Sequence, residues 1–257
     1  MLALISPAKT LDPHPTPLPV ASTQPFFQPL ALELVEIMRG FDAPALQTLM
    51  NISPALARLN ADRFQNYLDH PTSTDGHPSA QLYRGDTYTG LDVDSWSPDD
   101  WGFAQDHLRI LTGLYGLLRP LDRIQPYRLE MGTRLATPRG KDLYAFWGKR
   151  LIEVITQEVA AHANPTVINL ASEEYAKAVA GLPMVTPIFK EERRGGLQVI
   201  GLMAKRARGA MARHLITHRL ETPDPLQGFT AGGYRYRPEL SDPTHWIFTR
   251  PQVAATP

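Results

Sequence analysis

Short apolar runs and helical periodicities alternate along this chain of 257 residues. The run Leu2–Ile5 predicts a short buried strand that ends at the following Ser-Pro pair. Runs rich in Val, Ile and Leu predict further strands at Thr166–Leu170, Met184–Phe189 and Leu197–Met203. Strands that alternate with helices are typical of a partly parallel sheet covered by helices. We therefore expect a mixed α/β fold.

Helical spacing of apolar residues fills most of the remaining chain. The clearest helix start is Ser97-Pro98-Asp99-Asp100, because serine caps a helix, proline fits its first turn and carboxylates suit its positive end. This helix is predicted to run to about Leu111, and longer helical patterns follow at Lys141–His162 and Ala204–Leu220. No repeat or linker divides the chain. We expect a single domain, residues 1–257, with a helical insertion around residues 30–160.

Composition excludes several classes of protein. The chain has no cysteine, which excludes thiol catalysis, cysteine-ligated zinc and iron–sulfur clusters. Residues 13–32 are uncharged, but six of them are proline, so they cannot form a spanning helix and should follow an extended path. The first residues lack the basic segment of a signal peptide. We expect a cytoplasmic protein with no membrane partner, no cofactor and no obligate protein partner.

The net charge of zero hides an uneven distribution along the chain. Residues 1–104 carry 5 basic and 12 acidic side chains, whereas residues 105–150 carry 9 and 4, and residues 203–257 carry 8 and 4. Two basic blocks opposed to an acidic one suit a polyanionic partner such as nucleic acid. The alternative is that folding brings the blocks together and cancels the field.

The first basic block contains a candidate helix-hairpin-helix element at residues 99–131. Two glycines in its turn would let backbone N–H groups approach a phosphate, which flanking cations neutralise. Alternatively, the glycines cap a helix and allow close packing, and the arginines are merely solvated. The candidate DNA-binding residues here are Arg109, Gly113, Tyr115, Gly116, Arg119, Arg123, Tyr127 and Arg128.

The second basic block contains the predicted helix Ala204–Leu220. Its apolar face is narrow, and Lys205, Arg206 and Arg208 lie among further cations with no acid in the same stretch. Such a helix suits a phosphate backbone. The alternative is an ordinary surface helix whose acidic partners come from neighbours in space.

Three other residue sets suggest different chemistry. Lys9 follows the first strand, where open α/β sheets bind ligands, and it contributes to the DNA hypothesis. An enzyme acting on a nucleic acid or nucleotide, with Lys9, Asn169 and Tyr175 at the strand ends, is the alternative function. No Gly-x-Gly-x-x-Gly, Walker loop or nucleophile elbow supports it. An iron site would use His214, His218 and Glu221.

Several segments together resemble the YaaA family of peroxide-stress proteins. The opening Leu-Ile-Ser-Pro-Ala-Lys-Thr-Leu is the first of them, and the others follow in order to near the end of the chain. Each segment alone is a weak signal, but the ordered set is specific. The segments are Leu4–Leu11, Tyr88–Leu91, Leu114–Asp122, Gln125–Gly132, Gly140–Tyr144, Phe146–Gly148, Asn169–Ser172 and Ala204–Gly209.

The resemblance implies a cytosolic protein that protects cells from hydrogen peroxide and is associated with lowering free iron. It also implies DNA binding through a helix-hairpin-helix element and a basic cleft on a mixed α/β fold. The chain departs from the family's pattern in its proline-dense segment after Asp12 and in an acidic stretch at Asp92–Asp100. By position, the hairpin would comprise Gly113, Tyr115, Gly116, Arg119, Tyr127 and Arg128, and the cleft Lys9, Lys205 and Arg208.

Overall fold

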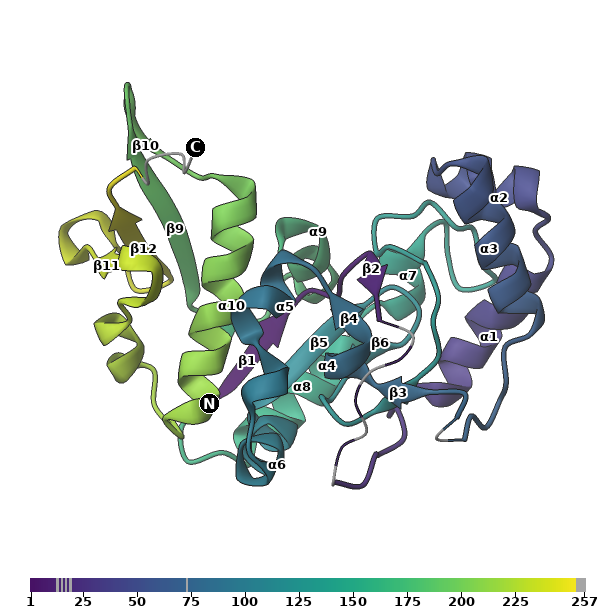
Figure 1. Ribbon diagram of the computed structural model, residues 1–257, viewed down its shortest axis with the longest axis horizontal. Coiled ribbons are helices and arrows are strands. Elements are labelled where there is room, and N and C mark those ends of the chain that lie inside the picture. Colours follow the sequence, from purple (N-terminus) through teal and green to yellow (C-terminus); the bar gives the residue numbers. More distant parts are fainter. Residues whose placement is uncertain (13, 15, 17, 19, 73, 253–257) are drawn as a thin grey trace.

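The central sheet is built around the first strand of the chain, β1 (Leu2–Ile5). In this computed structural model, which describes residues 1–252 except 13, 15, 17, 19 and 73, β1 pairs in parallel with β5 (Leu108–Thr112) and β8 (Val167–Leu170). Strand β6 (Gly116–Leu118) pairs antiparallel with β5, which gives the order β6-β5-β1-β8 (Figure 1). Every residue of these strands is buried, which explains their continuous apolar runs. The expected mixed α/β fold is confirmed.

A second sheet of four strands adjoins the first. Its order is β10 (Gly196–Gln198), β9 (Thr186–Arg193), β12 (His245–Arg250) and β11 (Arg235–Tyr236). Backbone hydrogen bonds of Val185 to β8 bring the start of β9 against the central sheet. The strand predicted at Leu197–Met203 is largely wrong, because a helix begins at Gly201.

The helices and remaining short strands surround these sheets. Helices α1, α2 and α3 form a group far from the second sheet (Figure 1). No helix in the part of the chain that the structure describes is long and apolar enough to cross a membrane. The helices are α1 (Gln28–Arg39), α2 (Ala43–Met50), α3 (Pro54–Gln65), α4 (Ser79–Leu82), α5 (Asp86–Leu91), α6 (Pro98–His107), α7 (Leu143–Trp147), α8 (Arg150–Ala160), α9 (Glu173–Ala176) and α10 (Gly201–Thr217). The short strands are β2 (Thr10–Leu11), β3 (His77–Pro78), β4 (Tyr83–Arg84) and β7 (Arg123–Ile124).

Two helical predictions need correction. The long helix expected at Lys141–His162 is two helices, because Gly148 adopts a φ of +54° between α7 and α8. The expected insertion around residues 30–160 is not purely helical, since β5, β6 and β7 lie within it. The path predicted for the proline-rich stretch falls partly outside the described residues, at Pro13, Pro15, Pro17 and Pro19.

The helix-hairpin-helix prediction is wrong. Helix α6 ends at His107, and the chain continues as two antiparallel strands, β5 and β6, that meet at the glycine turn. Parallel pairing with β1 and complete burial of Leu108–Thr112 outweigh the local helical pattern. The element at residues 99–131 is therefore a helix followed by a β-hairpin.

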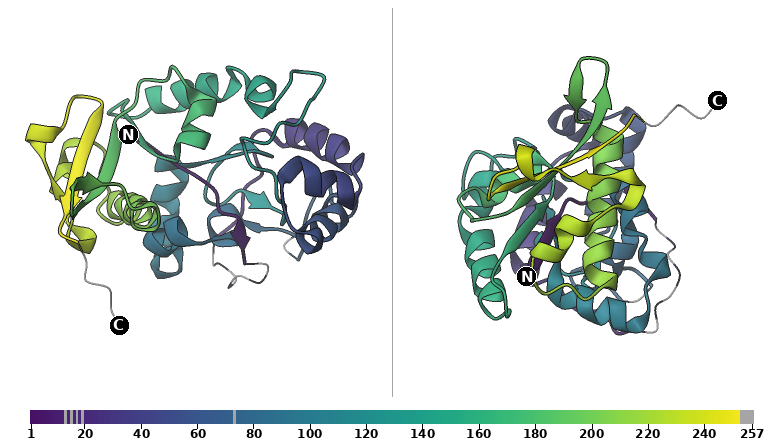
Figure 2. Two further views of the ribbon diagram at one scale, coloured as in Figure 1. Left: turned by 90° about the horizontal axis from the view of Figure 1, so that it is seen from above. Right: turned by 90° about the vertical axis from the view of Figure 1, so that its left-hand side faces the viewer.

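Helices α5 and α10 pack directly on each other. A Cβ atom on Gly90 would lie 2.1 Å from the carbonyl oxygen of Arg206, and one on Gly209 would lie 1.8 Å from that of Thr87. Only glycine permits this backbone contact. Figure 2 (left) shows α10 nearly end-on between α5 and the second sheet. The contact holds α10 beside the end of β1.

Candidate functional site

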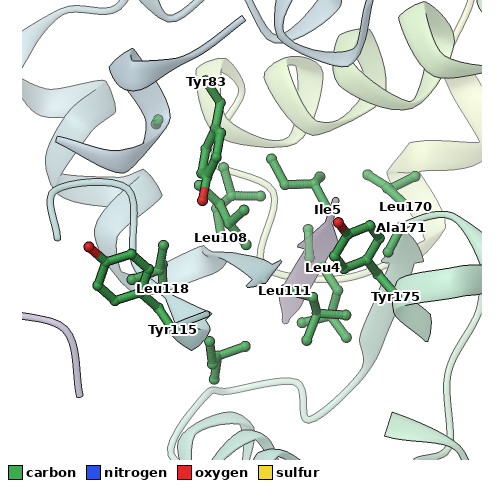
Figure 3. Packing of buried hydrophobic residues seen from close by; sticks show 14 of the residues in the cluster. Leu4, Ile5, Tyr83, Leu108, Leu111, Tyr115, Leu118, Leu170, Ala171 and Tyr175 are labelled. Carbon is green, nitrogen blue, oxygen red and sulfur yellow. The ribbon is translucent and has the colours of Figure 1, made fainter. Parts of the chain in front are cut away.

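A cavity of about 270 Å³ lies at the carboxyl ends of β1 and β8. The chain leaves β1 for β5 on one side and later returns to β8 on the other, so the strand order reverses at β1. In open α/β sheets such a reversal opens a crevice at the carboxyl ends of the strands, where ligands bind. Ser6 and Ser172, which follow the two strands, line this strand-end cavity. Tyr175 lies beside Ile5 at the same end (Figure 3).

Hydrogen bonds fix the floor of the cavity. The Ser172 N–H donates to Ser6 Oγ at 2.8 Å, and the Tyr88 hydroxyl donates to the Ser6 carbonyl at 3.1 Å. The hydroxyls of Tyr83 and Tyr127, two further lining residues, are 2.7 Å apart. Burial raises the pKa of Tyr83 and Tyr127, so these phenols stay neutral.

Two cations of the cavity, Lys9 and Arg128, share one acidic partner. Glu130 accepts from Lys9 Nζ at 2.8 Å and from Arg128 Nη2 at 2.7 Å. Lys9 is mostly exposed, whereas Arg128 is largely buried. The Nε of Arg128 is buried and has no hydrogen-bond partner among the described residues.

Two other cations of the cavity, Lys205 and Arg208, come from α10 and have no partner. Neither makes an ion pair or hydrogen bond to any residue that the structure describes, yet both line the cavity. Burial lowers the pKa of Arg208, although a guanidinium stays charged near neutral pH. A partly desolvated, unpaired cation is unfavourable until an anion reaches it. These two side chains therefore form a cationic edge of the cavity that has no acidic partner among the described residues.

Two other arginines of α10, and Arg219 just beyond its end, pair with acids from α5, α6 and the segment between them. This agrees with the alternative interpretation of the basic helix for these positions, including Arg206, which was a candidate DNA contact. The polarised surface expected from the charge blocks is correspondingly reduced. The ion pairs are Arg206–Asp86 (3.4 Å), Arg213–Asp92 (2.9 Å) and Arg219–Asp100 (2.5 Å).

The glycines of the predicted hairpin serve packing. A Cβ atom on Gly113 would lie 2.3 Å from the Leu129 carbonyl oxygen. One on Gly116, whose φ is +70°, would lie 2.7 Å from the Trp147 ring. Both glycines are buried, as is Tyr115, so this turn offers no N–H groups to a phosphate. The predicted phosphate contacts at these three residues are wrong.

Three of the four arginines of this region that were predicted to bind DNA do not line the strand-end cavity, whereas Arg128 does. Arg109 is 5% exposed, and its Nε donates to Glu158 at 2.8 Å, so the structure contradicts a DNA contact there. Arg119 pairs with the buried Asp122 at 3.1 Å. Arg123 lies on β7 at another cavity.

The structure brings together some residues of the alternative enzyme site but forms no metal site within the described residues. Asn169 is not in the cavity, because its side chain bonds to the Ala171 N–H and to Thr186. Lys9 and Tyr175 do line it together. The proposed iron ligands form no site, since the described residues contain no metal-binding group of three His, Cys, Asp or Glu side chains.

Four charged residues of the cavity were not among the candidates from the sequence: Arg84, Asp86, Glu130 and Glu174. Glu130 lies two positions after Arg128 in a segment already singled out, and Glu174 precedes Tyr175. Their adjacency to candidate residues was the available signal. Arg84 lacked one, because only the pairing of β4 with β2 brings it near Lys9.

Comparison with known proteins identifies the family. The family model described as "Peroxide stress protein YaaA" matches residues 1–240. The chain belongs to this family. A UPF0246 protein of Magnetococcus marinus is 51% identical over 97% of this chain and 99% of its own length. A UPF0246 protein of Dinoroseobacter shibae is 46% identical over 100% of this chain and 97% of its own length.

Membership in the YaaA family supports a role in peroxide stress. The segments that suggested the resemblance converge on one place in the structure. Residues from four of them line the strand-end cavity, within Leu4–Leu11, Gln125–Gly132, Asn169–Ser172 and Ala204–Gly209. The segment Tyr88–Leu91 contributes indirectly, because its Gly90 allows α10 to approach. This cavity is therefore the candidate functional site.

Proposed function

We propose that this protein is a cytoplasmic peroxide-stress protein that binds DNA at the strand-end cavity and its α10 edge. The observation that carries the proposal is the pair Lys205 and Arg208, two unpaired cations at a cavity. Phosphate is the anion that DNA presents, and lysine and arginine supply most of the affinity for its backbone. The proposed consequence is less oxidative damage to the DNA, with free intracellular iron kept low.

The size of the cavity favours DNA with unpaired nucleotides. A volume of about 270 Å³ is too small for a duplex. Single-stranded or branched DNA can place one strand along α10 and enter the cavity. Lys9 and Arg128, already paired with Glu130, would add weaker contacts.

The test is a binding titration with labelled single-stranded, duplex and four-way-junction DNA at several salt concentrations. The double variant Lys205→Ala/Arg208→Ala should lower affinity at least tenfold. It should also reduce the slope of log affinity against log salt by about 0.7–0.9 for each phosphate interaction that the substitutions remove. The control is Arg213→Ala, on the same helix but paired with Asp92, which should change neither. Equal behaviour of the two variants, or a salt-independent affinity, would contradict the proposal.

An enzyme acting on nucleotides or nucleic acids is the second candidate. The observation that favours it is Tyr175, whose pKa is raised by burial and by Glu174, in a cavity shared with Lys9. A buried neutral phenol and a lysine in one cavity can serve as an acid–base pair. The test is incubation with panels of nucleotides and DNA followed by product analysis. Turnover that Tyr175→Phe abolishes would support the enzyme, and no product from any substrate would oppose it.

A further inference from the structure

We propose that the strand-end cavity receives a single nucleotide whose base carries an amino group. Its phosphate lies at Lys205 and Arg208, and the amino group donates to Glu174. This inference rests on the proposed function, because it names the unit of DNA that enters the cavity.

The volume and walls of the cavity fit one nucleotide. Cavities that hold drug-sized molecules start at about 300 Å³, so about 270 Å³ suits one small ligand or one unit of a polymer. A phosphate alone would leave most of that space empty. The rings of Tyr127 and Tyr175 and the side chains of Leu129 and Leu170 line it. Aromatic and apolar walls of this kind stack or pack against a base.

The polar groups of the cavity are unevenly distributed. The unpaired positive charge belongs to α10, through Lys205 and Arg208. Glu174, at the start of α9, supplies an unpaired acceptor, whereas the lining carboxylate Asp86 pairs with Arg206 at 3.4 Å. The Oε1 of Glu174 accepts from the Gly132 N–H at 2.8 Å, whereas its Oε2 has no hydrogen bond within the described part of the chain. Glu130 differs, because both of its oxygens already bind cations.

This distribution requires a ligand with an anionic end and a donor end. A nucleotide with an amino-bearing base has both, since its phosphate is anionic and its exocyclic amine donates. Carboxylates accept from the N4 amine of cytosine, whereas uracil and thymine present a carbonyl oxygen at that position. A carboxylate repels that oxygen. The cavity should therefore discriminate between otherwise similar pyrimidine nucleotides.

The experiment is calorimetric titration of the full chain with dCMP, dUMP and inorganic phosphate. We expect dCMP to bind about tenfold more tightly than dUMP, the lower end of what one good base contact supplies. Phosphate alone should bind more weakly than dCMP. Arg208→Ala should weaken all three, because it removes the anion contact.

Glu174→Gln isolates the base contact. Glutamine keeps an oxygen for the Gly132 N–H but loses the charge, and its amide can donate to the uracil oxygen. The ratio of the affinity for dCMP to the affinity for dUMP should fall toward one, while the affinity for phosphate stays unchanged. Glu173→Gln, at the exposed neighbouring position, is the matched control and should keep the preference.

Three outcomes would overturn the inference: equal affinity for dCMP and dUMP, phosphate binding as tight as dCMP, or no nucleotide binding. The same variants titrated with single-stranded DNA separate this failure from failure of the proposed function. If DNA binding still depends on Lys205 and Arg208, DNA binding stands and only the nucleotide pocket is wrong. If DNA binding is also absent, both proposals are wrong.

Discussion

Two residue types, glycine and arginine, account for most of the difference between the expected and the observed site. Glycines at positions 113 and 116 pack against Leu129 and Trp147 instead of facing a ligand. Glycines at positions 90 and 209 let two helix backbones meet. The arginines of α10 divide by their partners, because Arg206 and Arg213 pair with acids and Arg208 pairs with none. Residue type alone therefore does not separate the two roles.

Replacement of Gly209 by alanine should separate α10 from α5. The added methyl group meets backbone rather than a movable side chain, so we expect a loss of about 3 kcal/mol or more of unfolding free energy. DNA affinity should fall as well, because Lys205 and Arg208 move with the helix. Urea unfolding measures the first effect and the binding titration the second. Gly201→Ala, which meets nothing within 4 Å, is the control and should be neutral or slightly stabilising.

Arg109→Ala should affect stability and leave DNA binding unchanged. The Nη1 of Arg109 donates to the carbonyls of Gln105 and Leu108, and its removal leaves these acceptors unsatisfied. We expect a loss of about 1–3 kcal/mol in urea unfolding. The salt dependence of DNA binding should match the wild type. A reduced salt slope at full stability would instead restore Arg109 as a DNA contact.

At the scale of elements, α10 combines two charge environments on one helix. Arg206 and Arg213, and Arg219 just beyond the end of the helix, pair with acids of the segment 86–100 on α5, α6 and the stretch between them. Lys205 and Arg208 project to the end of β1 without partners. The helix is thus both a packing element and the cationic edge of the cavity. Individual exposed ion pairs contribute little to stability. The close contact at Gly90 and Gly209 therefore matters more than these pairs for the position of α10.

The second sheet contains a buried ionic cluster that should make stability depend on pH. Glu191 on β9 is 1% exposed and pairs with Arg250 on β12 and with Arg193, each at 2.6 Å. Burial alone would raise the pKa of Glu191, but hydrogen bonds from Arg250 and Arg193 outweigh it and lower the pKa. Its stabilising contribution is therefore complete above the unfolded pKa, about 4.3, and is lost as pH falls through the lower folded value.

Glu191→Gln should lose about 3–5 kcal/mol at pH 7, because it leaves buried guanidinium charge uncompensated. It should also show a smaller decline of stability between about pH 5 and pH 3 than the wild type. Urea unfolding across this range measures both effects. The neighbouring Glu192→Gln is the control, since Glu192 is exposed and lies 4.0 Å from Arg237. Parallel pH profiles for Glu191→Gln and the wild type would show that Glu191 does not carry the acid sensitivity.

At the scale of the whole molecule, the fold brings the acidic and basic blocks of the chain together. Acids of the first block pair with arginines of the last, and Arg139 pairs with Glu33 at 2.8 Å. The field that the sequence suggested is partly cancelled, whereas Lys205 and Arg208 at the strand-end cavity stay outside these ion pairs. The salt dependence of DNA binding should therefore report a few contacts there rather than the net charge of the protein.

Local signals in the sequence were sufficient for the class of fold and for many helix boundaries. Continuous apolar runs identified β1 and β8, because a strand buried on both faces needs them. Helices α2, α3 and α6 begin after Asp42, Ser53 and Ser97, whose side chains accept from backbone N–H groups of the first turn. Lys9, Lys205 and Arg208, which the resemblance assigned to a cleft, line one cavity together with Arg128, which it assigned to the hairpin.

Only the tertiary structure decided the conformation after α6 and the roles of the individual cations. Leu108–Thr112 is a strand because it pairs with β1, which lies far away in the sequence at the start of the chain. This pairing supplies backbone hydrogen bonds to the strand and buries it. Arg206 is neutralised and Arg208 is not because Asp86, distant in sequence, lies beside one and not the other. Strand pairing, close glycine contacts and ion pairs all depend on residues far apart in the chain. Their outcome follows from the assembled fold, while caps and apolar runs follow from the sequence itself.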